Sequence, residues 1–226
     1  MSDNKYRPNL LKRATAEFLG TAFLLAVVVG SGIMGERLAN GNTAIALLAN
    51  SLATGAGLIF LILTFAPISG AHFNPAVTLA GFLQKNTSLS ETLVYSLAQI
   101  CGAFAGTAMA NAMFELPLFF ASNKIRNGSP LIFSEFTATF GLLAVILSVV
   151  KFRVSVAPFA VAAYITSAYW FTASTSFANP AVTLARTLTD TFTGIRAADA
   201  PPFIIAQFAG AIAAVFLFRW LLKEER

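Results

Sequence analysis

One string of seven residues occurs twice in this chain. Asn-Pro-Ala-Val-Thr-Leu-Ala fills positions 74–80 and again positions 179–185, separated by nearly half of the 226 residues. Each copy follows an apolar stretch. Each also places asparagine directly before proline, which is the order of a helix N-cap and the first helical residue. Two identical loop-to-helix turns predict a duplicated structural unit.

The composition places this unit in a lipid bilayer. The chain is 57% hydrophobic and only 11% charged, with a mean hydropathy of +0.73, whereas a soluble domain carries about 25% charged residues. The net charge of +5 does not indicate nucleic-acid binding. The basic residues stand in short segments between apolar runs and form no single patch.

Apolar runs long enough to span a bilayer occur six times. They cover roughly 14–34, 43–66, 92–113, 131–150, 154–173 and 202–222. Two shorter pieces, 75–84 and 180–190, begin inside the repeated string. At about 1.5 Å per residue they are too short to cross a bilayer. We expect them to be half-helices that start within the membrane.

Further matches flank the repeated string. Glu17-Phe18 recurs as Glu135-Phe136, and Ala98-Gln99 recurs as Ala206-Gln207, in the same order along the chain. Each half therefore holds three spans and one half-helix. Because three is odd, the second half enters from the opposite side of the membrane. The sequence predicts an all-α membrane protein with six transmembrane helices, two half-helices and an inverted 3+3 repeat.

The distribution of charge predicts the orientation. With the N-terminus inside, ten of the 15 Lys and Arg residues fall on the cytoplasmic side, which favours cytoplasmic N- and C-termini in the cell (inner) membrane. We expect a cytoplasmic segment at 1–13 and one membrane domain at 14–226. Within that domain, repeat one spans about 14–113 and repeat two about 131–222.

These features together resemble the aquaporin (major intrinsic protein) family. They are the paired Asn-Pro-Ala motifs, the Ser-Gly-Ala-His run at 69–72, one glutamate in spans one and four, and the inverted repeat, and they cover about Ala14 to Trp220. The resemblance implies a passive channel for water or small neutral solutes, assembled as a homotetramer, with no cofactor. We expect no enzyme, because no nucleophile–base pair or metal set can be assembled from the residues.

The two motifs are expected to form the centre of a pore. Half-helix N-termini carry partial positive charge, which opposes cations and protons. The motif asparagines would cap the half-helices with their oxygens and offer N–H donors to the solute, or serve only as caps. Carbonyls of 70–72 and 176–178 would supply acceptors. The predicted pore motifs are Asn74, Pro75, Ala76, Asn179, Pro180 and Ala181.

Two membrane carboxylates and one histidine accompany the motifs. In the family that the chain resembles, glutamates matching Glu17 and Glu135 brace the motif loops by accepting backbone N–H bonds. We favour this role over a proton relay, because the spans offer no further ionisable residues. His72 is the only histidine. It is expected to brace the loop or line the wall, since a lone histidine cannot hold a metal ion.

The resemblance also implies a narrow selectivity filter of four positions. Counting from the motifs places Thr54, Ser167 (or Thr166 after a shift of one), Ser176 and Val182 there. Family water channels carry a histidine in this set and an arginine directly after the second motif, where this chain has valine. The sequence therefore predicts a wide, uncharged filter that admits neutral solutes larger than water.

Arg186 complicates this prediction. It lies four residues after Val182 and so on the same helical face. It could reach the outer vestibule and restore a positive constriction. Alternatively, it caps carbonyls or pairs with Asp190, another four residues on.

Three functions remain open. The leading one is a broad channel for trivalent and methylated arsenicals, glycerol, urea and water, because an uncharged filter with valine resembles bacterial aquaporins associated with arsenic resistance. The second is a water-selective aquaporin with an atypical filter. The third is an ion-coupled secondary transporter, since inverted repeats with broken helices also occur in that class.

Overall fold

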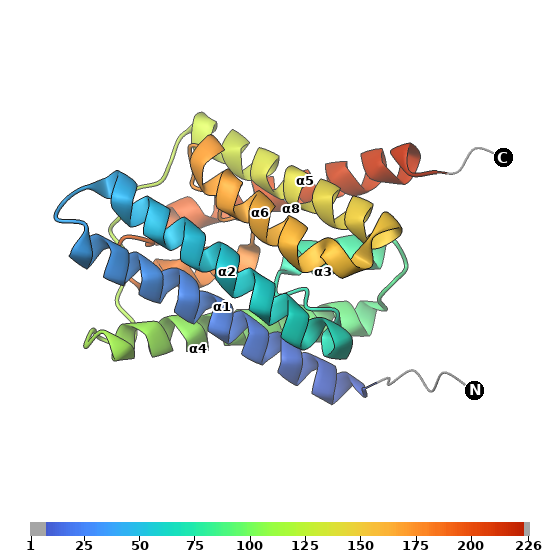
Figure 1. The fold of residues 1–226 in the computed structure, drawn as a ribbon, viewed down its shortest axis with the longest axis horizontal. Coiled ribbons are helices and arrows are strands. Elements are labelled where there is room, and N and C mark those ends of the chain that lie inside the picture. The colour runs from blue at the N-terminus through green and yellow to red at the C-terminus, as the bar shows by residue number, and fades with distance from the viewer. Residues whose placement is uncertain (1–7, 224–226) are drawn as a thin grey trace.

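The computed structural model describes residues 8–223, and this part of the chain is helical without strands (Figure 1). Six of its helical segments are long and apolar enough to cross a membrane. They are α1 (Leu10–Leu38), α2 (Thr43–Ser69), α4 (Leu89–Met113), α5 (Ser129–Phe152), α6 (Ala157–Phe171) together with the 3₁₀ turn Val154–Val156 before it, and α8 (Ala200–Leu221) together with the 3₁₀ turn Ala197–Asp199 before it. The six predicted spans are confirmed. Of the predicted segment 1–13, residues 1–7 lie outside the described part, and α1 already begins at Leu10.

Polar caps and turn residues set where the helices begin and end. The side chain of Asn42 accepts bonds from the first backbone N–H groups of α2. A reciprocal capping box between Ser88 and Glu91 starts α4. At the other end of α2, Gly70 has φ of +93°, a left-handed conformation that a side chain would strain. This turn directs the chain back into the protein as the first motif loop.

The two halves repeat the same packing. In the first half, Gly102 on α4 lies against the backbone of Phe18 on α1. In the second half, Gly210 on α8 lies against the backbone of Phe136 on α5. An added Cβ at either glycine would collide with a carbonyl oxygen, so only glycine permits these crossings. The small residues of spans three and six thus pack helices within one subunit.

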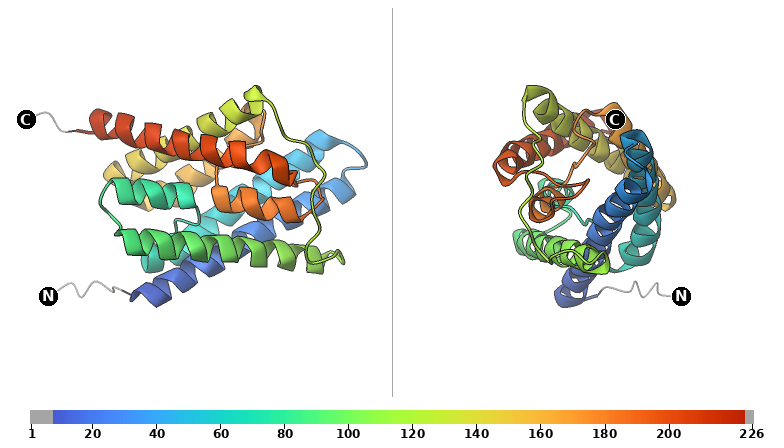
Figure 2. Two further views of the ribbon diagram at one scale, coloured as in Figure 1. Left: turned by 180° about the vertical axis from the view of Figure 1, so that it is seen from behind. Right: turned by 90° about the vertical axis from the view of Figure 1, so that its left-hand side faces the viewer.

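The two short helices lie end to end in the middle of the molecule (Figure 2). Helix α3 (Pro75–Leu83) points away from the centre toward the end where α1 begins and α8 ends, and α7 (Pro180–Ala185) points the opposite way. The second half-helix is shorter than predicted. It ends at Ala185 and continues as one 3₁₀ turn, Arg186–Leu188, instead of running to 190.

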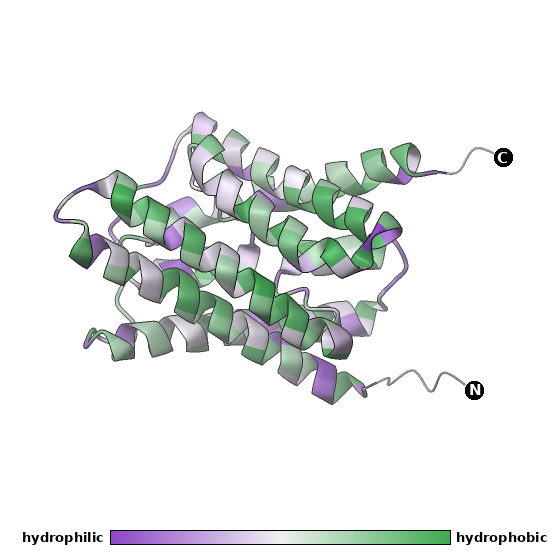
Figure 3. Ribbon diagram, viewed as in Figure 1, coloured by the Kyte–Doolittle hydropathy of each residue, from purple (hydrophilic) through white to green (hydrophobic). Residues whose placement is uncertain are grey.

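Hydrophobic residues make up most of the long helices (Figure 3), and many of the large ones are exposed. The exposed large hydrophobic residues include Phe23, Leu52, Leu97, Phe159 and Phe216, one from each of five spans. Polar residues gather at the helix ends and in the loops. A surface of this kind needs lipid around it, so the chain is a multi-pass membrane protein.

Candidate functional site

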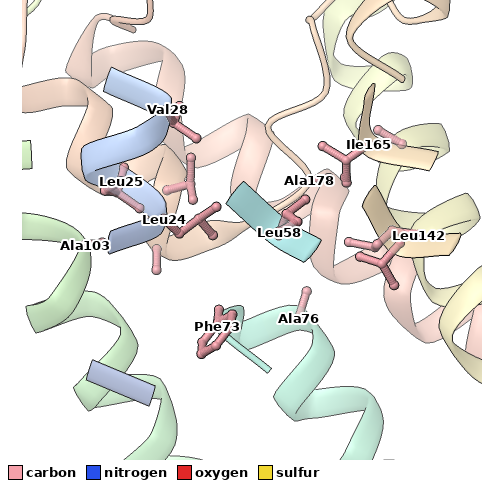
Figure 4. Packing of buried hydrophobic residues seen from close by; sticks show 14 of the residues in the cluster. Leu24, Leu25, Val28, Leu58, Phe73, Ala76, Ala103, Leu142, Ile165 and Ala178 are labelled. Carbon is pink, nitrogen blue, oxygen red and sulfur yellow. The ribbon is translucent and has the colours of Figure 1, made fainter. Parts of the chain in front are cut away.

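A cavity of about 580 Å³ extends between the two motif loops. Its wall combines residues 70–74 and 176–179 from the loops with apolar side chains from α1, α2, α5 and α6. Figure 4 shows Leu24, Leu58 and Leu142 of this wall near the loop residues Phe73 and Ala178. Backbone without helical bonds thus lies at membrane depth beside a cavity, where it is tolerated.

Both motif asparagines cap their half-helices. The side-chain oxygen of Asn74 accepts the N–H of Ala76 at 2.9 Å. The side-chain oxygen of Asn179 accepts the N–H groups of Ala181 at 3.0 Å and Val182 at 3.3 Å. Each motif proline then occupies the first helical position and is buried. The capping expected from Asn-Pro is therefore present in both copies.

The asparagine nitrogens also join the two loops to each other. The amide nitrogen of Asn74 donates to the carbonyl of Ala178 at 2.7 Å. The amide nitrogen of Asn179 donates to the carbonyl of Phe73 at 2.8 Å. An amide group carries two N–H donors, so each asparagine keeps one more for the cavity that it lines. Sequence reasoning did not predict this reciprocal link.

The loop backbone takes the same unusual shape in both halves. Ala71 and Phe73 have φ of +52° and +49°, and the equivalent residues Ser176 and Ala178 have φ of +51° and +49°. Non-glycine residues rarely adopt left-handed conformations, which cost free energy and persist only where surrounding structure enforces them. These four residues also line the cavity.

The two glutamates provide that enforcement. Glu17, fully buried, accepts the N–H groups of His72 at 3.0 Å and Phe73 at 2.7 Å. Glu135 accepts the N–H groups of Phe177 at 2.9 Å and Ala178 at 2.8 Å. Each carboxylate thus satisfies two backbone donors that no helix or strand serves. This geometry matches the predicted bracing role.

Two glutamines complete each brace, and sequence reasoning missed them. Gln99 donates to Glu17 and to Thr78, both at 2.9 Å. Gln207 donates to Glu135 at 2.6 Å and to the hydroxyl of Thr183 at 2.8 Å. The signal was present in the sequence, because the Ala-Gln pair recurs between the two halves.

His72 takes part in both expected roles. Its backbone N–H binds Glu17. Its ring nitrogen Nδ1 lies 3.1 Å from the hydroxyl of Thr78, and the ring meets that of Tyr95 edge-on at 5.5 Å. The residue also lines the cavity. Within residues 8–223 no group of three or more His, Cys, Asp or Glu side chains could hold a metal ion.

Three of the four predicted filter residues line the cavity: Thr54, Ser176 and Val182. Ser167 does not. It is exposed on the outer face of α6, and its hydroxyl binds the carbonyl of Ala163 on its own helix.

Span five contributes Ile165 and Tyr169 instead. The hydroxyl of Tyr169 lies 3.2 Å from that of Thr54 across the cavity wall. Residues four apart share a helix face, whereas Ser167 lies midway between them on the other side. The alternative, Thr166, binds Ala162 and Ser51 toward α2.

Comparison with known proteins agrees with this geometry. The family model for the major intrinsic proteins matches residues 5–158 and 151–226. The chain belongs to the major intrinsic protein family.

Two relatives and one solved structure illustrate the match. The "Aquaglyceroporin AqpS" of Rhizobium meliloti (strain 1021) is 51% identical over 218 residues, which cover 96% of this chain and 93% of that protein. "Aquaporin TIP1-2" of Musa acuminata is 34% identical over 141 residues, 60% of this chain and 56% of that protein. The X-ray structure of the aquaglyceroporin from Plasmodium falciparum aligns with a TM-score of 0.75 at 23% identity, covering 95% and 97% of the two chains, and supports the fold. Family and fold make the protein a channel for small solutes.

In this aquaporin, Arg186 does not pair with Asp190. The arginine is 2% exposed and lines the cavity, its Nε donates to the carbonyl of Thr193, and its guanidinium lies 3.4 Å from the ring centre of Phe177. Asp190 instead accepts bonds from Asn123, through the backbone and the side chain, both at 3.0 Å. Of the two partners considered for Arg186, Asp190 is therefore wrong and a backbone carbonyl, that of Thr193, is present. The cavity lining beyond Val182 includes a charged residue.

Proposed function

We propose that this aquaporin conducts neutral solutes larger than water, such as glycerol, urea and trivalent or methylated arsenicals, together with water. The observation that carries the proposal is Val182. Its side chain lines the cavity directly after the second motif, where the resemblance to water channels leads us to expect arginine. Valine is shorter than arginine and carries no charge, so the passage beside it is wider.

Neighbouring positions support a wide passage. Thr54 and Ser176 also line the cavity with short side chains. Their hydroxyls, together with loop carbonyls and the free asparagine N–H groups, suit a solute that both donates and accepts hydrogen bonds. The relative at 51% identity is named an aquaglyceroporin, which favours the same solute class.

Passive conduction fits the way the buried carboxylates are used. The carboxylate oxygens of Glu17 and Glu135 accept hydrogen bonds from backbone N–H groups and from glutamine amides. Ion coupling normally needs an intramembrane ionisable or carbonyl ion site that changes between states, and the two membrane carboxylates are already committed to bracing the loops. This arrangement disfavours an ion-coupled transporter.

Stopped-flow light scattering of proteoliposomes tests the proposal. Gradients of water, glycerol and a methylated arsenical should each dissipate through the wild type without a proton or sodium gradient. In the variant Val182→Arg, glycerol and arsenical flux should fall roughly tenfold or more while water flux persists, because a long charged side chain narrows the passage. Unchanged solute flux in that variant would show that position 182 does not set the width.

A water-selective channel is the second candidate. Tyr169 adds an aromatic side chain to the wall, and its hydroxyl contact with Thr54 fixes the ring in place. The fixed ring of Tyr169 would narrow the cavity, whereas the short side chain of Val182 would widen it. High water permeability with exclusion of glycerol and arsenicals would favour this candidate over the first.

We further propose that the channel is a homotetramer in the cell (inner) membrane with cytoplasmic termini. Helices α1 and α8 reach the same end of the molecule (Figure 2), and the charge bias favours that end as cytoplasmic. Cross-linking of the protein in membranes tests the assembly. Labelling of cysteines placed in the α1–α2 and α4–α5 loops tests the orientation, since reagent added outside intact cells should reach both.

A further inference from the structure

The second motif is followed at one helical turn by a buried arginine without an acidic partner. Among residues 8–223, Nε of Arg186 has one acceptor, the carbonyl of Thr193, and its two terminal nitrogens have none. The side chain is nevertheless 2% exposed and borders the cavity. A guanidinium carries five N–H donors, so most of its donor capacity is available to whatever fills the cavity.

Phe177 holds this guanidinium in place. Arg186 lies 3.4 Å from the ring centre of Phe177, and Arg126 lies 5.1 Å from the same centre. Cation–π contacts of this kind are strengthened away from water. Arg126 binds the carbonyls of Gly194 at 2.8 Å and Ser174 at 3.3 Å, so it fastens the loops on both sides of the ring.

The two arginines therefore differ in how they use their donors. All three guanidinium nitrogens of Arg126 donate hydrogen bonds to loop carbonyls. Burial lowers the pKa of Arg126 to about 10, which leaves it charged at neutral pH and adds to the positive potential. Arg186 keeps its terminal nitrogens for the cavity. Of the two, Arg186 is the one that can meet a solute.

A second unsatisfied group lies close by in the sequence. The hydroxyl of Ser176, directly before Phe177, is buried without a hydrogen-bond partner and lines the same cavity. A buried hydroxyl without a partner is costly unless water or a solute binds it. Within residues 8–223, the terminal nitrogens of Arg186 and the hydroxyl of Ser176, from the two sides of the second motif, therefore both lack partners on one cavity.

The position of the charge relative to Val182 is the distinctive feature. The four residues from Val182 to Arg186 amount to about one turn, or roughly 5–6 Å along the helix. The short side chain directly after the motif leaves the passage wide, and the guanidinium of Arg186 borders the same cavity over the ring of Phe177. Width and charge are therefore supplied by different residues.

We propose that Arg186 is the charge-selecting residue of this pore and that Val182 sets the width of the pore independently. This inference rests on the proposed function as a solute channel. Arg186 repels cations and protons, and with the hydroxyl of Ser176 it binds the oxygen of a passing hydroxylated solute. Phe177 and Arg126 are positioning residues that hold Arg186 at the wall.

The role of the Arg186 charge can be tested by measuring proton and cation leak into proteoliposomes that contain a pH dye and carry a potassium diffusion potential. Arg186→Gln keeps a side-chain amide that can donate to Thr193 but removes the charge, whereas Arg186→Lys keeps the charge. Proton and cation leak should rise roughly tenfold to a hundredfold in the glutamine variant, given one charge at close range in a partly desolvated site. Leak in the lysine variant should stay close to that of the wild type.

Matched controls separate this effect from misfolding. Arg37 also stacks on an aromatic ring, that of Phe114, and binds its carbonyl, but it does not line the cavity. Arg37→Gln should leave the leak unchanged. Water flux measured in the same vesicles verifies that each variant is folded and inserted.

The double variant Val182→Arg with Arg186→Gln tests the separation of roles. It should exclude cations again, because the charge returns directly after the motif, and it should pass little glycerol. Glycerol flux that persists in Arg186→Gln without any increase in leak would overturn the inference and leave the solute channel intact. If the wild-type protein itself conducted no glycerol, that result would instead refute the proposed function.

Ser176→Ala tests the solute-binding part. Glycerol flux relative to water flux should fall about threefold to tenfold, as expected for loss of one modest hydrogen bond, with no change in proton leak. An unchanged ratio would remove Ser176 from the site.

Discussion

Replacing Glu135 by glutamine tests whether the carboxylate brace holds the second motif loop. Glu135 accepts three hydrogen bonds, from the N–H groups of Phe177 and Ala178 and from the amide of Gln207. Glutamine has nearly the same shape but only one oxygen. Its NH₂ group would face a backbone N–H at about the present 2.8–2.9 Å, so two donors would oppose each other.

The cost follows from the bonds that are lost. Hydrogen bonds to a charged group contribute about 1.5–3 kcal/mol, and leaving a buried donor unsatisfied adds about 1–3 kcal/mol. With partial relaxation we expect a destabilisation of about 2–4 kcal/mol. For a chain of this length each kcal/mol lowers Tm by about 2–4 °C. The apparent Tm of Glu135→Gln should therefore fall by roughly 5–15 °C.

Thermal unfolding of the purified protein in detergent, followed by intrinsic fluorescence, measures this shift. Glu36→Gln is the matched control, because Glu36 is exposed on α1; its Tm should stay within about 2 °C of the wild type. Solute flux through Glu135→Gln should also fall, since the loop carbonyls lose their fixed positions. A variant that melts with the wild type and conducts normally would refute the bracing argument.

Two further perturbations test the packing and the outer loops. Gly106→Ala should destabilise the protein by about 1–3 kcal/mol, because a Cβ would collide with the carbonyl of Ala22. Gly30→Ala, whose Cβ would meet its nearest neighbour at an ordinary 3.4 Å, should be neutral or stabilising in the same melt. Hydrogen bonds from Asn123 hold the pKa of Asp190 below its ordinary 3.8. The stability it provides is therefore complete above pH 3.8 and lost as the pH falls through the lowered pKa. The protection factor of the Asn123 amide, its exchange rate relative to the intrinsic rate at the same pH, should therefore fall in acid and stay constant at pH 5–8.

Much of this architecture could be predicted because its signals are local or repeated. The length of each apolar run fixes a span, and Asn-Pro fixes the start of each half-helix. The recurrence of Glu17 as Glu135 identified both braces. The same reasoning applied to the recurring Ala-Gln pairs would have found Gln99 and Gln207.

The errors lie where only tertiary structure decides. Span five carries no motif, and apolar residues occur on every face of this helix. The sequence therefore does not show which face of the helix points toward the cavity. Counting from the motifs therefore predicts Ser167 where the structure has Tyr169 at the cavity. The choice between a backbone carbonyl and Asp190 as the partner of Arg186 could not be made from the sequence for a related reason. Its acceptor, the carbonyl of Thr193, depends on how the chain folds back after α7, and no local rule favours it over a nearby carboxylate.

The exchanged bonds between Asn74 and Asn179 bear on how such a protein could arise. Each asparagine completes the loop of the other half, through the carbonyls of Ala178 and Phe73. One half alone would leave its motif carbonyl and its amide without partners. An ancestral single unit of three spans would therefore have to meet a second copy inserted upside down, so that two identical chains in opposite orientations shared one pore. Gene fusion then fixes one orientation for each half, which frees the outer half to acquire an arginine that the inner half, with Gly81 at the equivalent place, does not have.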